Sequence, residues 1–181
     1  MVQPTSPITK VRIWNTNLDS MLYCEVPVEG GRPLEKGDYN IPGVPGTGAK
    51  IQVDFAKTAG QGAGALRPTG NPMDRLDVAG FGRIDASMID IGNPHVFIRA
   101  KDVGMTGTET ADEIDADKTL CDLLEKIRSH AAYCMGMISK PDRGKQESPA
   151  APIIGMISPS QDYDAPLSDR TVLASECDFL S

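Results

Sequence analysis

The side chains that could transfer a proton or bind a metal ion are few and far apart in this sequence. There are two histidines, His95 and His130, and four cysteines, which are Cys24, Cys121, Cys134 and Cys177. A zinc site takes three or four ligands at recurring spacings, and no Cys-x-x-Cys pair is present to begin one. We therefore expect free, mostly buried thiols and no metal site.

Nucleophilic catalysis is equally hard to assign to particular residues. A serine or cysteine nucleophile needs a base beside it, and the sequence has neither a Gly-x-Ser-x-Gly turn nor a Cys–His pattern. His95 follows Asn93 and Pro94 at the start of a predicted strand, where its ring could hydrogen-bond the corner or reach a ligand. Stabilising the corner is the commoner role, and His130 falls on the surface or boundary of a predicted helix. No residue receives a catalytic role from its type and spacing.

Two further segments suggest ligand sites but have simpler explanations. The acidic residues between positions 109 and 117 lack EF-hand spacing and suit a helix N-terminus, so we favour a solvated face over a cation site. The glycines of residues 58–71 could aim backbone amides at an anion, but no phosphate-loop or dinucleotide-binding pattern is present. For this segment we favour a flexible connection between strands.

Length and charge narrow the class of protein. A chain of 181 residues predicts about one domain or slightly more. Its 18 lysines and arginines stand against 25 acidic residues, and a net charge of −7 disfavours nucleic acid as the main partner. Neither a membrane-spanning apolar run nor a signal-peptide pattern is present. We expect a cytoplasmic protein with no nucleic-acid and no membrane partner.

Alternating apolar and polar residues predict strands in the first half of the chain. Residues 11–14 and 21–28 are extended runs on either side of turn-forming residues 15–20, a pattern typical of a β-hairpin. Prolines and glycines exclude a helix over residues 41–48, which we expect to form a structured loop. Residues 51–55 alternate cleanly and predict a half-buried strand.

One long helix is expected among the strands of the second half. Apolar residues recur at three- and four-residue steps over residues 117–135, Gly136 is placed to cap the C-terminus, and Thr110 and Glu113 have the spacing of a capping box upstream. The predicted strands are residues 83–90, 96–98 and 153–157, with a turn at 91–95, loops at 139–151 and 159–169, and a last extended run at 171–174. This order indicates an α+β, or mixed α/β, fold.

Several segments, taken together and in order, resemble the 2-methylaconitate isomerase family. They are residues 11–17 (Val-Arg-Ile-Trp-Asn-Thr-Asn), 43–47 (Gly-Val-Pro-Gly-Thr), 68–71 (Pro-Thr-Gly-Asn), 92–94 (Gly-Asn-Pro), 104–109 (Gly-Met-Thr-Gly-Thr-Glu) and 127–132 (Ile-Arg-Ser-His-Ala-Ala). The resemblance covers about residues 10–180. It implies a fold similar to diaminopimelate epimerase and a small polycarboxylate substrate. It also implies proton transfer next to carboxylates without a metal or organic cofactor.

The resemblance also sets expectations for domains and activity. Family members are roughly twice as long, and their proton-transferring lysine and cysteine lie upstream of the Val-Arg-Ile-Trp segment, the cysteine in a Gly-Asn-Cys-Gly-Asn context. Neither motif occurs here. We expect residues 1–9 to be a flexible leader and residues 10–181 to span the end of one family domain and the start of the second. We expect a truncated isomerase-family form, inactive alone, that acts on or binds small tricarboxylates.

Two other interpretations stay open. The first is a non-catalytic binding or interaction protein on the isomerase scaffold, with self-association or a partner chain covering the incomplete fold. The second is an enzyme with relocated chemistry that uses His95 or a cysteine.

Site residues can be carried over only at matching positions. The resemblance implies substrate binding by Thr69, Gly70 and Asn71 in one loop, and by Asn93, which matches an asparagine that faces the substrate in the related epimerases. Arg67 stands where the family more often has an apolar residue, and we interpret it as an exposed substitution rather than an anion contact.

Overall fold

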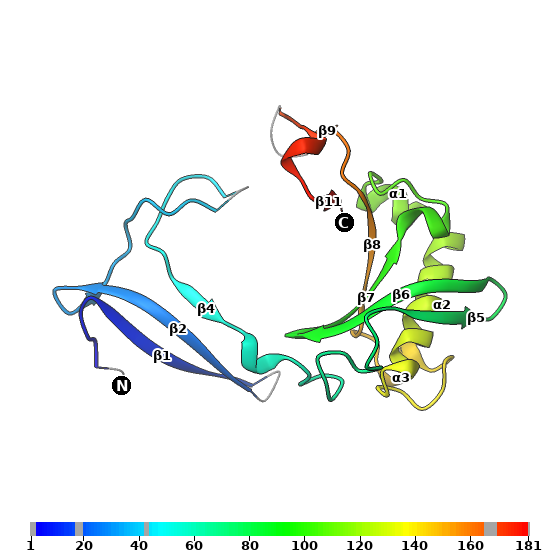
Figure 1. Ribbon diagram of the computed structural model, residues 1–181, viewed down its shortest axis with the longest axis horizontal. Coiled ribbons are helices and arrows are strands. Elements are labelled where there is room, and N and C mark those ends of the chain that lie inside the picture. Colours follow the sequence, from blue (N-terminus) through cyan, green and yellow to red (C-terminus); the bar gives the residue numbers. More distant parts are fainter. Residues whose placement is uncertain (1–2, 17–19, 42–43, 165–169, 181) are drawn as a thin grey trace.

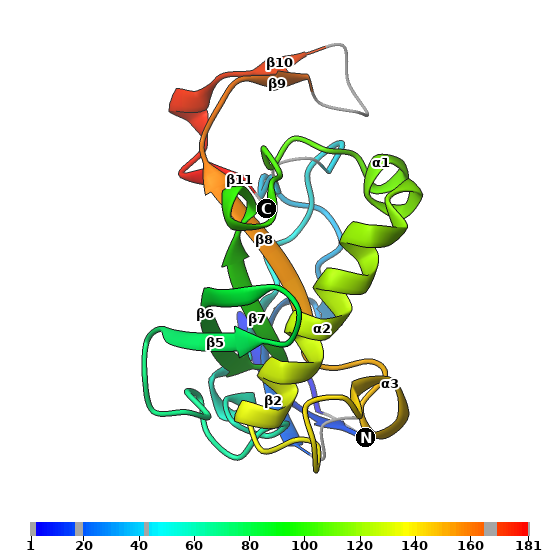
Figure 2. The same ribbon diagram turned by 90° about the vertical axis from the view of Figure 1, so that its right-hand side faces the viewer.

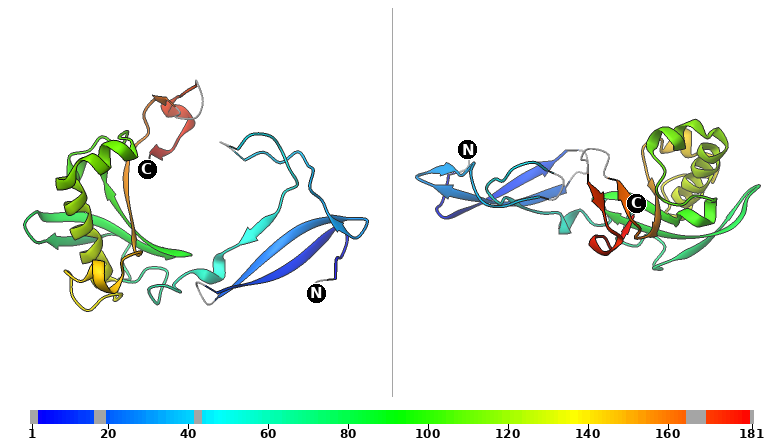
Figure 3. Two further views of the ribbon diagram at one scale, coloured as in Figure 1. Left: turned by 180° about the vertical axis from the view of Figure 1, so that it is seen from behind. Right: turned by 90° about the horizontal axis from the view of Figure 1, so that it is seen from above.

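The computed structural model has two parts, each built on its own sheet (Figure 1). It describes residues 3–16, 20–41, 44–164 and 170–180. The first sheet lies at one end of the molecule, and the second sheet with the long helix lies at the other. The views from behind and from above show the same separation (Figure 3). The chain passes from one part to the other through the glycine-rich segment that precedes residue 74.

The first sheet is an antiparallel hairpin with two short additions. It contains β1 (Ile8–Asn15), β2 (Ser20–Glu29), β3 (Arg32–Pro33) and β4 (Gln52–Asp54). β2 lies between β1 and β4 in the sheet, and the register pairs Ile13 with Leu22 and Cys24 with Val53. The predicted hairpin is confirmed, although its connecting residues 17–19 lie outside the described part of the chain. β1 begins at Ile8, two residues before the expected start of order.

One face of this sheet is apolar and is not covered by any helix. Because residues paired across antiparallel strands share a face, Val11, Ile13, Leu22 and Val53 project to the same side. Ile13 is 44% exposed and Val53 is 41% exposed. The prediction of a half-buried strand at residues 51–55 was therefore wrong about burial: the alternation is present, but Val53 is exposed, whereas Leu22 and Cys24 on the same face are buried.

The second sheet has five strands in the order β11, β8, β7, β6, β5. Its strands are β5 (Asp74–Val78), β6 (Gly82–Ile91), β7 (Asn93–Arg99), β8 (Ile153–Pro159) and β11 (Phe179–Leu180). The pairs are antiparallel except β7 and β8, which run parallel. A parallel pair needs a long crossover, and here the crossover carries α2 (Lys118–Cys134).

α2 covers one face of this sheet and closes the main core (Figure 2). Its buried Ile127 and Ala131 join Leu76, Met88 and Ile98 of the strands in one cluster. The helix begins after Asp117, whose carboxylate accepts from the Leu120 amide at 2.9 Å. It ends before Gly136 at φ +74°, as the sequence predicts.

Short elements fill the connections. The 3-10 turns are η1 (Ala56–Thr58), η2 (Ala100–Val103) and η3 (Ala174–Glu176), and the small helices are α1 (Ala111–Ala116) and α3 (Gly144–Glu147). α1 has the predicted capping box of Thr110 and Glu113. α3 lies where a loop was expected, and β9 (Tyr163–Asp164) pairs with β10 (Thr171–Val172). Of the predicted loops, residues 42–43 and 165–169 lie outside the described residues.

Candidate functional site

The predicted loop of Thr69, Gly70 and Asn71 closes around a carboxylate of the chain itself. Thr69 Oγ1 donates to Asp74 Oδ2 at 2.5 Å, and Asn71 Nδ2 donates to Asp74 Oδ1 at 2.7 Å. Gly70 turns the loop at φ +82°, with its amide bonded to the Arg67 carbonyl at 2.9 Å. The two side chains expected to bind substrate therefore hold Asp74 at the start of β5.

This arrangement affects how the loop can meet a ligand. The single hydrogen of the Thr69 hydroxyl is donated to Asp74, so it cannot be donated to a ligand. Asn71 donates one of its two amide hydrogens to Asp74, and the other is available. The negative charge of Asp74 also opposes an anionic ligand at close range. That charge acts on the end of α2 as well: burial, and then Asp74, raise the pKa of the Cys134 thiol. A raised pKa keeps this thiol protonated and poorly nucleophilic.

Asn93 is placed differently, at the corner between β6 and β7. Asn93 pairs with Ile91 across the tight turn, and Gly92 between them has φ +84°. The predicted turn at residues 91–95 is thus narrower than expected, since β7 already begins at Asn93. The Asn93 side chain is exposed, and among the described residues we find no hydrogen bond to its amide group. Among the four predicted substrate-binding residues, Asn93 is therefore the one whose side-chain N–H groups are both free to bind a ligand.

His95 is oriented by the same corner. Its Nδ1 lies 2.7 Å from the Asn93 carbonyl oxygen, and its ring stacks on Phe97 with the centroids 5.6 Å apart. A carbonyl only accepts, so Nδ1 carries a hydrogen and the lone pair of the neutral ring is on Nε2. His95 therefore stabilises the corner, as its commoner role predicts, and presents a defined nitrogen from the sheet face opposite α2.

The glycine-rich segment does hold an anion, but the anion belongs to the chain. The amides of Gly62 and Ala63 both donate to Asp90 Oδ2 at 2.7 Å, and the Asp90 side chain is completely buried. Backbone bonds from the Gly60 amide to the Asp90 carbonyl and from the Asp90 amide to the Leu66 carbonyl, both 2.9 Å, fix the same segment to β6. The amides that could have bound a phosphate are thus occupied by Asp90.

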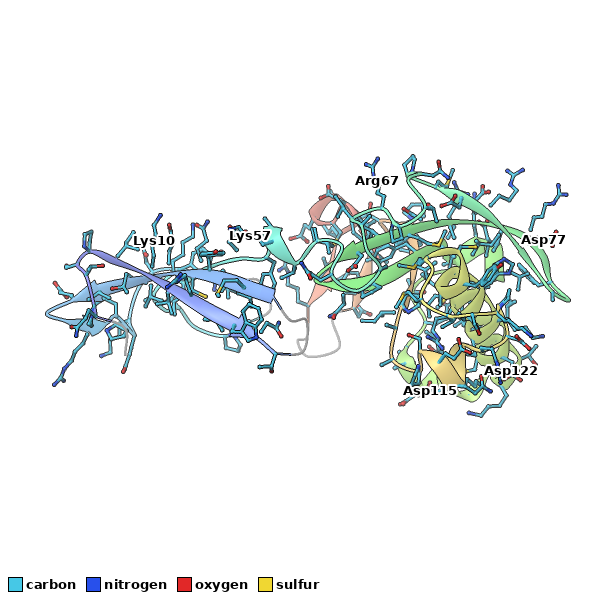
Figure 4. All side chains as sticks on the ribbon, turned by 90° about the horizontal axis from the view of Figure 1, so that it is seen from below. Lys10, Lys57, Arg67, Asp77, Asp115 and Asp122 are labelled. Carbon is cyan, nitrogen blue, oxygen red and sulfur yellow. The ribbon has the colours of Figure 1, made fainter. Side chains whose placement is uncertain are left out.

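The four predicted binding residues are not brought into one contact set. Asp74 pairs with Ala86 on β6, whereas Asn93 lies opposite Ile91. Five residues of strand separate Ala86 from Ile91, which is about 17 Å. The Thr69–Asn71 loop and Asn93 therefore lie at two separate points along β6. Arg67 is exposed and points away from this loop (Figure 4).

The acidic segment and the cysteines offer no cation site within the described residues, where no group of three His, Cys, Asp or Glu side chains is placed for a metal. Instead the acids order their own loops. Hydrogen bonds from the Thr106 amide, and further bonds from the Thr106 hydroxyl and the Gly107 amide, lower the pKa of Glu109 from 4.5 to about 2. All four cysteines are free, as expected, but the expectation that most are buried was wrong: only Cys24 is buried, and Cys134 is exposed apart from partial desolvation of its thiol.

Comparison with known proteins gives the chain its family. Residues 1–180 match the PrpF protein family. The chain belongs to this family. It is 41% identical over 180 residues to 3-methylitaconate isomerase of Eubacterium barkeri, covering 99% of this chain and 47% of that protein. It is 38% identical over 181 residues to 2-methyl-aconitate isomerase of Shewanella oneidensis, covering 98% of this chain and 45% of that protein.

A solved structure supports the fold. The crystal structure of methylitaconate-delta-isomerase matches with a TM-score of 0.86 and 40% identity, covering 98% of this chain and 46% of that one. The diaminopimelate epimerase-like, α+β fold implied by the resemblance is therefore confirmed. The PrpF chain spans about half the length of these relatives. No helix among the described residues is long and apolar enough to cross a membrane.

Two carboxylates that hold loops of the chain, Asp74 and Asp90, were not identified from the sequence. Each acts on a loop that precedes it in the chain, through bonds that span 5 residues to Thr69 and 28 residues to Gly62. An aspartate in a strand gives no sign of this role. The only indication in the sequence was the glycine-rich segment with its Thr-Gly-Asn residues, whose donors could bind an anion. It did not show that the anion would be a carboxylate of the same chain.

Proposed function

We propose that this PrpF-family chain forms part of the binding site of an isomerase that shifts a double bond, or interconverts cis and trans forms, in a small tricarboxylate by proton transfer. Relatives that cover nearly all of it are named as isomerases of 3-methylitaconate and 2-methyl-aconitate. The observation that carries the proposal here is the exposed, unengaged amide of Asn93 at the β6–β7 corner.

The chemistry divides between binding and proton transfer. Moving a proton beside a carboxylate needs donors that stabilise the enolate-like intermediate, and a base and an acid on the carbon. The Asn93 amide supplies a donor. Thr69, Gly70 and Asn71 lie about 17 Å away along β6 and hold Asp74, so we assign the contact with the small ligand to Asn93. The lysine and cysteine motifs of the family do not occur in these 181 residues. These residues alone therefore bind without isomerising, and full activity needs groups from outside this stretch.

The proposal also covers the domain position of the site, the cellular compartment and the cofactor requirement. The first sheet is the end of one family domain and the second sheet is the start of the other. The reaction takes place in the cytoplasm and uses neither a metal nor an organic cofactor. A small polycarboxylate is the only ligand that it requires.

The test is proton exchange in heavy water. The purified chain is incubated with trans-aconitate, 2-methylaconitate and 4-oxalomesaconate, and NMR follows the carbon-bound protons of the ligand and the amide shifts of the protein. We expect amide shifts around Asn93 and no exchange above the protein-free control. Asn93→Ala weakens binding about tenfold, the effect of losing one hydrogen bond to a charged group. Asn40→Ala, in an exposed loop of the first part, is the matched control.

Either of two results contradicts the proposal. Exchange by the chain alone would show that a base lies within it, and His95→Ala together with the four Cys→Ser variants would then locate that base. Shifts that are absent, or equal in Asn93→Ala and the unaltered chain, would remove Asn93 from the site.

A second function is favoured by one observation, the uncovered apolar face of β1, β2 and β4. Ile13 and Val53 are exposed on a sheet face that also carries Val11, Leu22 and Cys24. Contiguous exposed apolar surface marks protein–protein contact. In this alternative the scaffold serves association with a second copy or a partner chain.

A further inference from the structure

A cavity of about 510 Å³ lies where β7 and β8 both end. Arg99 is the last residue of β7, Ile157 to Pro159 are the last three of β8, and Phe179 of β11 lies beside them. Ligands of open α/β sheets bind outside the carboxyl ends of parallel strands. The volume also falls within the range of small-molecule sites, roughly 300 to 1,000 Å³.

This cavity is distinct from the proposed tricarboxylate site. Asn93 is the first residue of β7 and Arg99 is the last, so the two lie at opposite ends of the strand. Six residues of extended chain separate them by about 20 Å. The Thr69–Asn71 loop does not line the cavity.

The lining combines an apolar wall with a small polar group of residues. Each kind of side chain comes from more than one element. The apolar residues are Met105, Ile157, Pro159 and Phe179, the cations are Arg99 and Lys101, and the hydroxyls are those of Thr106 and Ser158. A site with mostly apolar walls and few polar groups suits a ligand that has one charged end.

Charge pairing leaves Lys101 as the available cation. The Arg99 guanidinium lies 3.5 Å from Asp85 and 3.6 Å from Asp102, so its charge is already compensated. No ion pair of Lys101 is found among the described residues. Glu109, which could have opposed an anion, is engaged by the Thr106 amide and hydroxyl, each at 2.8 Å.

The Ser158 hydroxyl does not face the apolar wall. Its oxygen is buried and has no hydrogen-bond partner in the part of the chain that the structure describes. It lies against Gly107, at φ +90°, where a Cβ atom would collide with Ser158 Oγ. Successive side chains of a strand project to opposite faces of the sheet, so this hydroxyl lies on the other face from Ile157 and Pro159.

We infer that this cavity binds a small monocarboxylate with an apolar chain. The carboxylate pairs with the Lys101 ammonium. The apolar chain packs against Ile157 and Phe179. A tricarboxylate fits poorly, because its other two charges would be desolvated against the apolar wall.

The probe is hexanoate, titrated into the ¹⁵N-labelled 181-residue chain and followed by NMR. We expect saturable amide shifts at Lys101, Thr106 and Ser158. Hexylammonium, of equal chain length and opposite charge, should give none. Lys101→Gln should weaken hexanoate binding at least about fivefold, since a charge-assisted hydrogen bond is lost. Lys36→Gln, at an exposed position of the first part, is the matched control.

The hexanoate experiment can fail or succeed independently of the proposed tricarboxylate site at Asn93. Asn93→Ala should leave hexanoate binding unchanged, even if the tricarboxylate proposal fails. If Lys101→Gln does not fold, Phe179→Ala replaces it and should also weaken binding, because the apolar wall loses a side chain. Equal binding of hexanoate and hexanol, shifts outside the cavity, or competition by trans-aconitate would each overturn the inference.

Discussion

Asp74 is one carboxylate that holds a loop and also acts on the end of α2. It accepts from Thr69 and Asn71 and raises the pKa of Cys134, for which burial is the larger cause. Asp74→Asn removes the charge and replaces one acceptor oxygen with a donor. We expect the Cys134 pKa to fall while staying above its ordinary value, and the free energy of unfolding to fall by about 1.5 to 3 kcal/mol. Alkylation rates against pH, resolved for each cysteine by mass spectrometry, measure the first effect, and urea unfolding measures the second.

Asp77→Asn is the control for this prediction. Asp77 is an exposed residue of the same strand and points away from the body of the protein (Figure 4). Its substitution should leave both the Cys134 pKa and the unfolding midpoint unchanged. An unchanged Cys134 pKa in Asp74→Asn would show that burial alone sets it.

The lowered pKa of Glu109 predicts how the stability of the fold changes at low pH. Its pKa is about 2 in the folded chain because the Thr106 and Gly107 amides and the Thr106 hydroxyl bond the carboxylate, against 4.5 in the unfolded chain. The unfolded state therefore takes up the proton first as the pH falls. The stability that Glu109 contributes is fully present above pH 4.5 and is lost as the pH falls towards 2.

Urea unfolding of the unaltered chain and of Glu109→Gln, at steps from pH 6 to about 2, tests this sign. We expect the unaltered chain to be the more stable at pH 6 and the difference between the two proteins to shrink below pH 4.5. Glu35→Gln, in an exposed connection of the first part, should show no such convergence. A constant difference across the range would mean that the Thr106–Glu109 bonds do not form.

At the scale of elements, α2 depends on its first turn. Asp117 caps the helix through the Leu120 amide, and Asp117→Ala leaves that amide without its side-chain partner. We expect a loss of about 1 kcal/mol in the free energy of unfolding and faster hydrogen exchange at Leu120. Asp122→Ala, on the exposed side of the same helix (Figure 4), should change neither. Equal effects of the two substitutions would indicate a general loss of helix charge rather than a lost cap.

The elements also show what periodicity can and cannot predict. β6 and α2 have long, regular patterns and end within two residues of their predicted bounds, whereas the first strand of the hairpin begins three residues before its predicted start. β5 was missed because its two apolar residues, Leu76 and Val78, alternate over only five positions. β11 has two residues and no period at all. β4 shows the opposite problem, since its alternation is clear but burial depends on a covering element that a local pattern cannot reveal.

The candidate site was predictable only in part, for a similar reason. Motif order identified the family and pointed to the Thr69–Asn71 loop and Asn93. It could not show that Asp74 takes the donors of the loop or that Asp90 fills the glycine-rich segment. Such contacts depend on which strand a loop lies against. The cavity at the ends of β7 and β8 likewise exists only once a parallel crossover brings Arg99 and Ile157 together.

For the whole molecule, the uncovered face of the first sheet predicts self-association. Burying Ile13 and Val53 against a second copy is favourable at about 25 cal/mol per Å² of apolar surface. The net charge of −7 opposes contact between copies, and salt screens that repulsion. We therefore expect dimers or larger species at high protein concentration, and more of them at 0.5 M than at about 0.05 M salt. Sedimentation velocity over a concentration series measures both trends.

The double variant Ile13→Lys with Val53→Lys places charges on the apolar face and should keep the chain monomeric at either salt concentration. Trp14→Lys is its control, because Trp14 is equally exposed but pairs with Met21 on the opposite face of the sheet. If association persists in the double variant, or weakens as salt is added, it runs through charged surface. The apolar face would then be no contact site, and the interaction function would lose the one observation that favours it.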